Sequence, residues 1–260
     1  MDLNLHQKRA IVTGGSKGIG FATAMTLSQE GAKVALIART KDELEAAAAR
    51  IREQTGGEVL AVQGDVSDEA SVYEAVRSIA DAWDGGLDIL VNNAGTAAGA
   101  PFEKVGSLAW KTDLDLKLLG AVQMTQAVLP YMKSSGGAIV NVTAIGGKTP
   151  PKSSLPSSVS RAAGIALTKA MSRDLAEFGI RVNAVCIGLI RSAQIEAVWK
   201  RTSPELTWEQ YAQDARHDIP LGRIGDTNEA AKAIVFLVSS AASYVTGTAL
   251  NIDGGKSPTT

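Results

Sequence analysis

Short, almost wholly apolar runs alternate with longer amphipathic stretches along most of the chain. The runs are rich in Val, Ile, Leu and Ala, which is typical of parallel strands covered on both faces. Seven runs are predicted as strands: Ala10–Thr13, Lys33–Ile37, Val59–Val62, Ile89–Asn92, Ala138–Val142, Arg181–Cys186 and Ala249–Ile252. Strands that alternate with helices indicate an α/β fold, a single doubly wound parallel sheet with right-handed crossovers.

The stretches between the runs carry recognisable helix starts. Thr40-Lys41-Asp42-Glu43 has the pattern of a capping box, and Ser67-Asp68-Glu69 opens the next helix with acidic side chains at its positive end. One long interruption, about residues 189–225, has a helical piece around Thr207–Ala215. An excursion of this length late in an α/β fold is typical of a substrate lid. We therefore predict one domain, residues 1–260, with a late helical lid.

Composition narrows the class of protein. The 260 residues are 45% hydrophobic and 20% charged, which is ordinary for a soluble globular domain, and the net charge of −1 favours neither nucleic acid nor a membrane as partner. Met1–Lys8 lacks the pattern of a signal peptide, and no apolar run approaches the roughly 20 residues that span a bilayer. Cys186 is the only cysteine, so a reducing cytoplasm is expected. With only His6 and His217 beside it, we predict no metal site.

A glycine-rich turn follows the first strand: Thr13-Gly14-Gly15-Ser16-Lys17-Gly18-Ile19-Gly20. Glycine allows a tight turn and lets a pyrophosphate approach bare N–H groups at a helix N-terminus. Glycines also serve plain turns, but this one lies between a predicted strand and a predicted helix, the arrangement of a Rossmann fold. The turn therefore predicts a dinucleotide site.

The end of the second strand bears on the choice of cofactor. NAD-binding forms need a carboxylate there to hold the ribose 2′-hydroxyl, whereas this chain has Ala38-Arg39-Thr40. Arg39 can stack on adenine and pair with a 2′-phosphate, and Lys17 can add charge. Arg39 can also be a solvated loop residue. The sequence favours NADP(H) over NAD.

Later motifs complete a family pattern. They are Asn92-Asn93-Ala94-Gly95, Gly64-Asp65-Val66, Arg181-Val182-Asn183-Ala184-Val185, Tyr244-Val245-Thr246-Gly247 and Asp253-Gly254-Gly255. With the glycine turn they resemble the short-chain dehydrogenase/reductase family over nearly the whole chain. The resemblance implies a small-molecule substrate, a cytoplasmic homotetramer or homodimer, and further cofactor contacts from Asp65, Val66, Asn93, Ala94, Gly95, Arg161, Gly188 and Ile190.

The resemblance fails at the family's catalytic positions. The replacements are Ala144 for the serine, Ser157 for the tyrosine, Arg161 for the lysine four residues later and Lys117 for the helix asparagine. A shifted alignment does not restore the tyrosine, because none lies between Tyr131 and Tyr211. The binding half of a dehydrogenase is present and its usual proton-transfer half is missing.

These replacements change the expected chemistry. Hydride delivery to a carbonyl generates an alkoxide that must be protonated as it forms. A serine hydroxyl is shorter and far less acidic than a phenol, and the Arg161 guanidinium is effectively never deprotonated. General acid help supplies about 10²–10⁴-fold in rate, roughly 3–5 kcal/mol. An efficient alcohol dehydrogenase of the usual kind is therefore not expected.

Lys117 is the sharpest anomaly, since an ammonium on a core-facing helix is costly unless it is paired or functional. It is a candidate proton donor, Schiff-base lysine or, with Arg161, carboxylate ligand. Alternatively it pairs with Asp113 or Asp115 or reaches the surface.

The lid offers two other candidate acids, Tyr211 and His217, which are equally readable as lid or interface residues. Trp199 and Trp208 give the lid an apolar face that suits a hydrophobic substrate, although plain packing explains them too.

Three functions remain open. The first is an NADP(H)-dependent oxidoreductase acting on a small carbonyl, enone or imine with an unusual proton source. The second is a non-redox lyase, isomerase or dehydratase on the same scaffold. The third is a catalytically silent nucleotide-binding regulatory protein. The family pattern favours the first.

Overall fold

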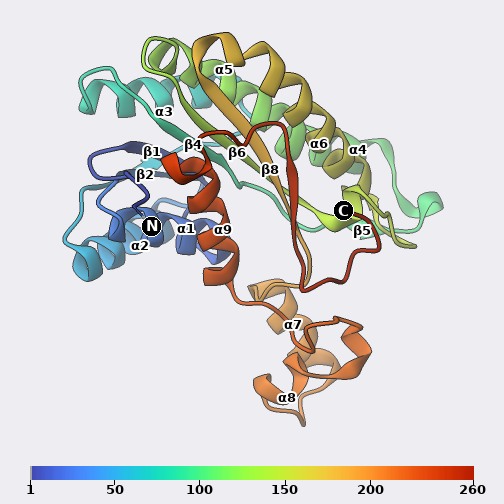
Figure 1. The fold of residues 1–260 in the computed structure, drawn as a ribbon. Helices are drawn as coiled ribbons and strands as arrows, with labels where there is room; N and C mark the ends of the chain where they lie inside the picture. Colours follow the sequence, from blue (N-terminus) through green and yellow to red (C-terminus); the bar gives the residue numbers. More distant parts are fainter. Residues whose placement is uncertain (1) are drawn as a thin grey trace.

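A single parallel sheet forms the centre of the computed structural model, which describes residues 2–260 (Figure 1). Its strand order is β3-β2-β1-β4-β6-β8-β9, and all six pairings are parallel. The strands are β1 (Arg9–Thr13), β2 (Lys33–Ala38), β3 (Val59–Gln63), β4 (Ile89–Asn92), β6 (Gly137–Ala144), β8 (Ile180–Ile187) and β9 (Ala249–Ile252). The predicted doubly wound sheet and all seven predicted strands are confirmed, with some ends extended by one or two residues.

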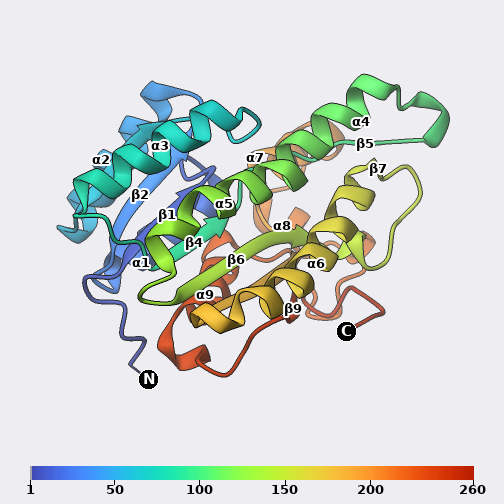
Figure 2. The same ribbon diagram turned by 90° about the horizontal axis from the view of Figure 1, so that it is seen from above.

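Helices cover both faces of the sheet. Those that carry most of the packing are α1 (Gly18–Gln29), α2 (Lys41–Thr55), α3 (Glu69–Ala82), α5 (Gly120–Met132), α6 (Ser157–Asp174) and α9 (Thr227–Val238). One layer contains α1, α2 and α9, and the other contains α3, α5 and α6, which run side by side across the strands (Figure 2). Successive strand residues point to opposite faces, so Val12 packs into the first layer and Ile11 into the second.

The chain between β4 and β6 projects beyond one end of the sheet (Figure 2). It contains β5 (Gly99–Ala100), α4 (Ser107–Leu114) and a π-helical turn (Asp115–Leu119) that leads directly into α5. The short strand β5 pairs with β7 (Leu155–Pro156), just before α6. Sequence periodicity does not reveal strands of two residues, and this pairing was not predicted.

The predicted capping box at the start of α2 is wrong. Helix α2 does begin at Lys41, but the Thr40 side chain makes no capping hydrogen bond. The Glu43 carboxylate instead binds the Lys17 ammonium, with 2.8 Å between Oε1 and Nζ. An exposed carboxylate can bind a nearby cation as well as a backbone N–H, and the sequence pattern does not show which is in reach.

The start of α3 also differs from the prediction by one residue. Asp68 is the N-cap, and its carboxylate accepts from the N–H of Ala70. The Ser67 hydroxyl donates to Asp65 Oδ1 at 2.6 Å. Ser67 therefore orders the loop before the helix.

Residues 189–225 form a separate small unit beyond the carboxyl ends of the strands (Figure 1). A parallel bridge between Ile190 and Gly225 closes its base. The predicted helical piece is present as α8 (Trp208–Ala212), followed by a 3₁₀ turn (Ala215–His217), and α7 (Ala193–Thr202) precedes it. No helix in residues 2–260 is long and apolar enough to cross a membrane.

Candidate functional site

The glycine turn and the Asn92–Gly95 motif are joined where β1 and β4 end. Thr13 Oγ1 accepts from the N–H groups of Asn93 and Ala94, both at 3.0 Å. Asn93 Nδ2 donates in return to the carbonyls of Thr13 and Gly14, at 3.0 and 3.2 Å. The order of strands in the sheet reverses between β1 and β4, and ligands of open α/β sheets bind at such a point.

The glycine turn is tightly closed on its protein side and open on its outer side. A Cβ on Gly20 would lie 2.3 Å from the Gly14 carbonyl oxygen and 2.4 Å from Asn93 Nδ2. Gly18 has a φ of +57°, and a Cβ there would meet nothing within 4 Å. Helix α1 starts behind Lys17 without a side-chain cap, which leaves its first N–H groups for a ligand. This cradle fits a pyrophosphate.

Arg39 and Asp65 line a cavity beyond the ends of β2 and β3. Arg39 is exposed, and its carbonyl accepts from Gln63 Nε2 at 2.8 Å. Burial opposes ionisation of Asp65, but hydrogen bonds from Ser67 and the charge of Arg39 outweigh it and lower the pKa of Asp65. A cation and a carboxylate therefore face the place expected for the adenosine end of a dinucleotide.

Two of the residues that the resemblance assigns to catalytic positions, Lys117 and Ser157, meet in one buried cluster. Lys117 Nζ donates to Asp113 Oδ1 and, at 2.5 Å, to Ser157 Oγ. Ser160 Oγ donates to the other oxygen of Asp113, also at 2.5 Å. Ser157 Oγ also accepts from the N–H of Ala98 at 3.0 Å. The cluster joins α4, the π-helical turn and the first turn of α6.

Lys117 pairs with Asp113, one of the two carboxylates that the sequence offers as its partner. Only 1% of the Lys117 side chain and 3% of the Asp113 side chain are exposed. Asp115, the other candidate partner, instead pairs with Lys111 at 2.6 Å near the surface. Lys117 lies within the π-helical turn, a feature often found at functional sites.

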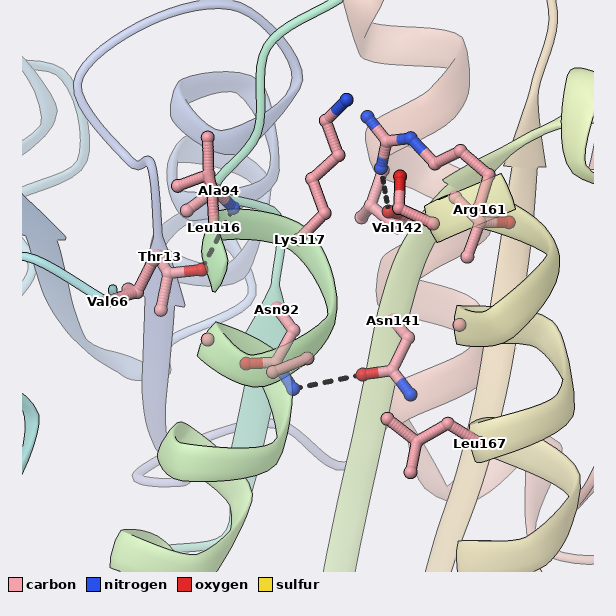
Figure 3. Close-up of a pocket in the computed structure, with 15 residues that line it drawn as sticks. Thr13, Val66, Asn92, Ala94, Leu116, Lys117, Asn141, Val142, Arg161 and Leu167 are labelled. Carbon is pink, nitrogen blue, oxygen red and sulfur yellow. Dashed lines mark hydrogen bonds between the residues drawn. The ribbon is translucent and has the colours of Figure 1, made fainter. Parts of the chain in front are cut away.

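The surroundings of Lys117 lower its pKa, which makes release of its proton easier than from an exposed lysine. Burial lowers the pKa of Lys117, its hydrogen bond to Asp113 opposes this, and the charge of Arg161 lowers it further. Arg161 Nη1 donates to the Val142 carbonyl at 2.7 Å. Figure 3 shows the ends of the two cationic side chains in the same space, and both line one cavity at the end of the sheet.

The other predicted residues are distributed around this cavity. Val66 and Ala94 line it, and Gly95 lies against the Arg161 guanidinium. Ala144 ends β6 beside Ile187 and carries no hydroxyl. The last two predicted residues lie at the base of the 189–225 segment. Gly188 packs on Asp253, and Ile190 belongs to the bridge that closes the segment.

Tyr211 and His217 belong to the core of the 189–225 segment. Tyr211 is 5% exposed, and its ring centroid lies 6.0 Å from that of Trp208 and 4.7 Å from that of His217. Trp199 completes this aromatic group. All four tyrosines of the chain lie within the described residues, and none lines the cavity that contains Lys117 and Arg161.

Three members of the site were not identified as functional from the sequence. The sequence indicates Asp113 only as a structural partner of Lys117, through their i,i+4 spacing. Ser160 and the Ala98 N–H carry no sequence signal, because the fold alone brings them to the cluster. In the lining of the cavity, Asn92 Nδ2 donates to Asn141 Oδ1 at 2.9 Å and links β4 to β6 (Figure 3).

Comparisons with known proteins agree with the fold and identify the family. A family model described as enoyl-(acyl carrier protein) reductase matches residues 14–257. The 3-oxoacyl-[acyl-carrier-protein] reductase FabG of Thermotoga maritima is 35% identical over 97% of this chain and 99% of its own length. L-sorbose reductase from Gluconobacter frateurii, complexed with NADPH and L-sorbose, has a TM-score of 0.95 at 32% identity and covers 100% of both chains. An NADPH-bound short chain oxidoreductase from Pseudomonas aeruginosa PAO1, described as containing an atypical catalytic center, has a TM-score of 0.92 at 35% identity, over 97% of this chain and 98% of that one.

Proposed function

Since the chain belongs to the short-chain dehydrogenase/reductase family, we propose that it is an NADP(H)-dependent oxidoreductase of a small carbonyl, enone or imine. Two of the structural neighbours named above were solved with NADPH. In this chain the end of β2 carries Arg39 and no acid, and Lys17 stands in the glycine turn. Both cations suit a 2′-phosphate, which supports NADP(H) over NAD.

The residues that would hold the cofactor follow from the open cradle. N–H groups of the turn Gly14–Gly20 would receive the pyrophosphate, with Arg39 and Asp65 at the adenosine end. Arg161 would contact the ribose hydroxyls near the nicotinamide. When bound, NADPH supplies the hydride, and the protein must supply a proton to the substrate.

The observation that carries the proposal is the 2.5 Å contact between Lys117 Nζ and Ser157 Oγ. In the reductive direction Ser157 gives its hydroxyl proton to the forming alkoxide and takes one from the Lys117 ammonium. The lowered pKa of Lys117 favours this transfer, and the amine that remains stays hydrogen-bonded within the cluster. Arg161 keeps its charge and stabilises the developing oxyanion.

In this proposal four replacements form one working site. By the resemblance, the positions of the family's asparagine, serine, tyrosine and lysine are held by Lys117, Ala144, Ser157 and Arg161. The site needs no phenol, because the ammonium takes the part of the acid and the short serine hydroxyl connects it to the substrate. Substrates whose reduction needs little acid assistance, such as iminium ions and conjugated alkenes, suit it best.

The test begins with a fluorescence titration of NADPH, followed by a screen of ketones, enones and imines for loss of cofactor absorbance. Binding with consumption supports the proposal. Binding without consumption would indicate a nucleotide-binding regulatory protein, and conversion of substrate without cofactor change would indicate a lyase, isomerase or dehydratase.

A serine variant then tests the residue roles. With a ketone substrate, whose alkoxide needs a proton, Ser157→Ala should lower kcat by about 10²-fold or more and leave the Kd of NADPH unchanged. Ser154→Ala is the matched control, because Ser154 Oγ donates only to the Pro151 carbonyl outside the cluster. Equal activity of the two variants would remove Ser157 from the mechanism.

A further inference from the structure

A carboxylate already binds one of the two cations that the proposed 2′-phosphate site needs. Lys17 Nζ lies 2.8 Å from Glu43 Oε1, and 66% and 45% of these side chains are exposed. Glu43 belongs to the first turn of α2, which begins shortly after Arg39. The end of β2 therefore lacks an acid in the sequence, but the following helix places one beside the glycine turn.

Arg39 and Lys17 differ in whether a carboxylate already binds them. Within residues 2–260, the Arg39 guanidinium has no carboxylate at ion-pair distance, although its charge helps to lower the pKa of Asp65. Lys17 is held by Glu43. An arriving 2′-phosphate would find Arg39 available, and it would have to separate Lys17 from its partner.

We propose that Glu43 shifts cofactor preference toward NAD(H) by competing with the 2′-phosphate for Lys17. This inference rests on the proposed function, because it concerns the same nucleotide site. When the phosphate takes Lys17, Glu43 loses its partner and becomes a like-charged neighbour of a group that carries close to two negative charges. A nucleotide with a plain 2′-hydroxyl leaves the Lys17–Glu43 pair intact. Glu43 thus weakens binding of the phosphorylated cofactor and lets the chain accept NAD(H) more readily than Arg39 alone would allow.

The expected size follows from the exposure of the pair. Exposed ion pairs contribute up to about 1 kcal/mol, so removal of the competitor should change affinity by roughly threefold to fivefold. Mobile ions screen exposed charges, so the effect should shrink as salt rises from about 0.01 M to 1 M.

The test uses two nucleotides that differ only in the 2′-phosphate, adenosine 2′,5′-bisphosphate and 5′-AMP, in calorimetric titrations of the whole chain. Glu43→Gln should tighten binding of the bisphosphate by roughly threefold to fivefold and leave 5′-AMP unchanged. In a Lys17→Gln background the same change at Glu43 should have a smaller effect, because the shared cation is gone.

Glu45→Gln provides the matched control. Glu45 lies on the same helix and faces Arg52 at 3.8 Å, so its loss removes the same charge away from Lys17. If Glu43→Gln leaves the ratio of affinities unchanged, or if Glu45→Gln changes it equally, the inference is wrong. If the wild-type chain binds both nucleotides, the proposed nucleotide site stands whatever the ratio does; if it binds neither, the proposed site and this inference both fall.

Discussion

Lys117 in the π-helical turn and Ser157 at the first position of α6 lie 2.5 Å apart, ammonium nitrogen to hydroxyl oxygen, although they are 40 positions apart in sequence. The contact joins the two helices that flank the cavity at the end of the sheet. It depends on Asp113, which binds the same ammonium and the hydroxyl of Ser160. The stability of the fold and the proposed chemistry therefore share one buried cluster.

Loss of Asp113 should destabilise the protein strongly. Asp113→Asn leaves the Lys117 ammonium buried without its counter-charge, and we expect a loss of about 3–5 kcal/mol in the free energy of unfolding, measured in urea. Asp115→Asn is the control, because its partner Lys111 is 73% exposed, and it should cost less than about 1 kcal/mol. Similar losses for the two variants would show that the buried pair is not what holds this region together.

The glycine turn predicts a difference between two alanine substitutions. Gly20→Ala places a methyl group 2.3 Å from the Gly14 carbonyl oxygen, so we expect a loss of about 3 kcal/mol and weaker NADPH binding. Gly18→Ala has open space and only an unfavourable φ, and should cost about 1 kcal/mol. Thermal unfolding and NADPH titration measure both. A larger cost for Gly18→Ala would contradict the packing described here.

Glu229 predicts a dependence of stability on pH. Arg223 donates to both of its oxygens and Asp226 donates its N–H, which lowers the pKa of Glu229 to about 2. Because the folded pKa lies below the ordinary value of 4.5, the contribution is full above about pH 4.5 and is lost as pH falls toward 2. Glu229→Gln should cost about 1 kcal/mol or less at pH 7, since the Glu229 side chain is 44% exposed, and almost nothing near pH 2. A cost that is the same at both pH values would rule out this linkage.

Restoring the family residues should restore ordinary chemistry. We expect Ser157→Tyr with Arg161→Lys to raise reduction of generic ketones by NADPH by up to about 10²-fold. Adding Lys117→Asn should raise it further, because the Lys117 side chain occupies the space beside position 157. Steady-state assays on a ketone panel measure the gain. No gain from either variant would mean that the cavity differs from the family site at more than these positions.

The sequence predicts the sheet because its strands are short, mostly apolar runs bounded by turn residues, and the central ones are buried. It also supplies the Asp113–Lys117 pair as an alternative, because i,i+4 spacing is a local property of helices. The contact with Ser157 depends on how α6 packs against the π-helical turn, which no local pattern encodes. Glu43 was misassigned for a related reason: its partner Lys17 lies on a different loop, and the capping pattern concerns only the helix itself.

The most direct test of the proposed proton source is the rate of NADPH oxidation in single-turnover stopped flow, with the ketone that the screen finds fastest, because the alkoxide formed from a ketone needs a proton. Wild-type protein is compared with Asp113→Asn, with Asp113→Asn/Lys117→Met, which leaves no unpaired charge in the cluster, and with Tyr211→Phe. We predict that the double variant is slower than Asp113→Asn by about 10²-fold or more at unchanged NADPH affinity, and that Tyr211→Phe matches the wild type. A double variant as fast as Asp113→Asn, or a comparable loss in Tyr211→Phe, would contradict a lysine–serine proton source.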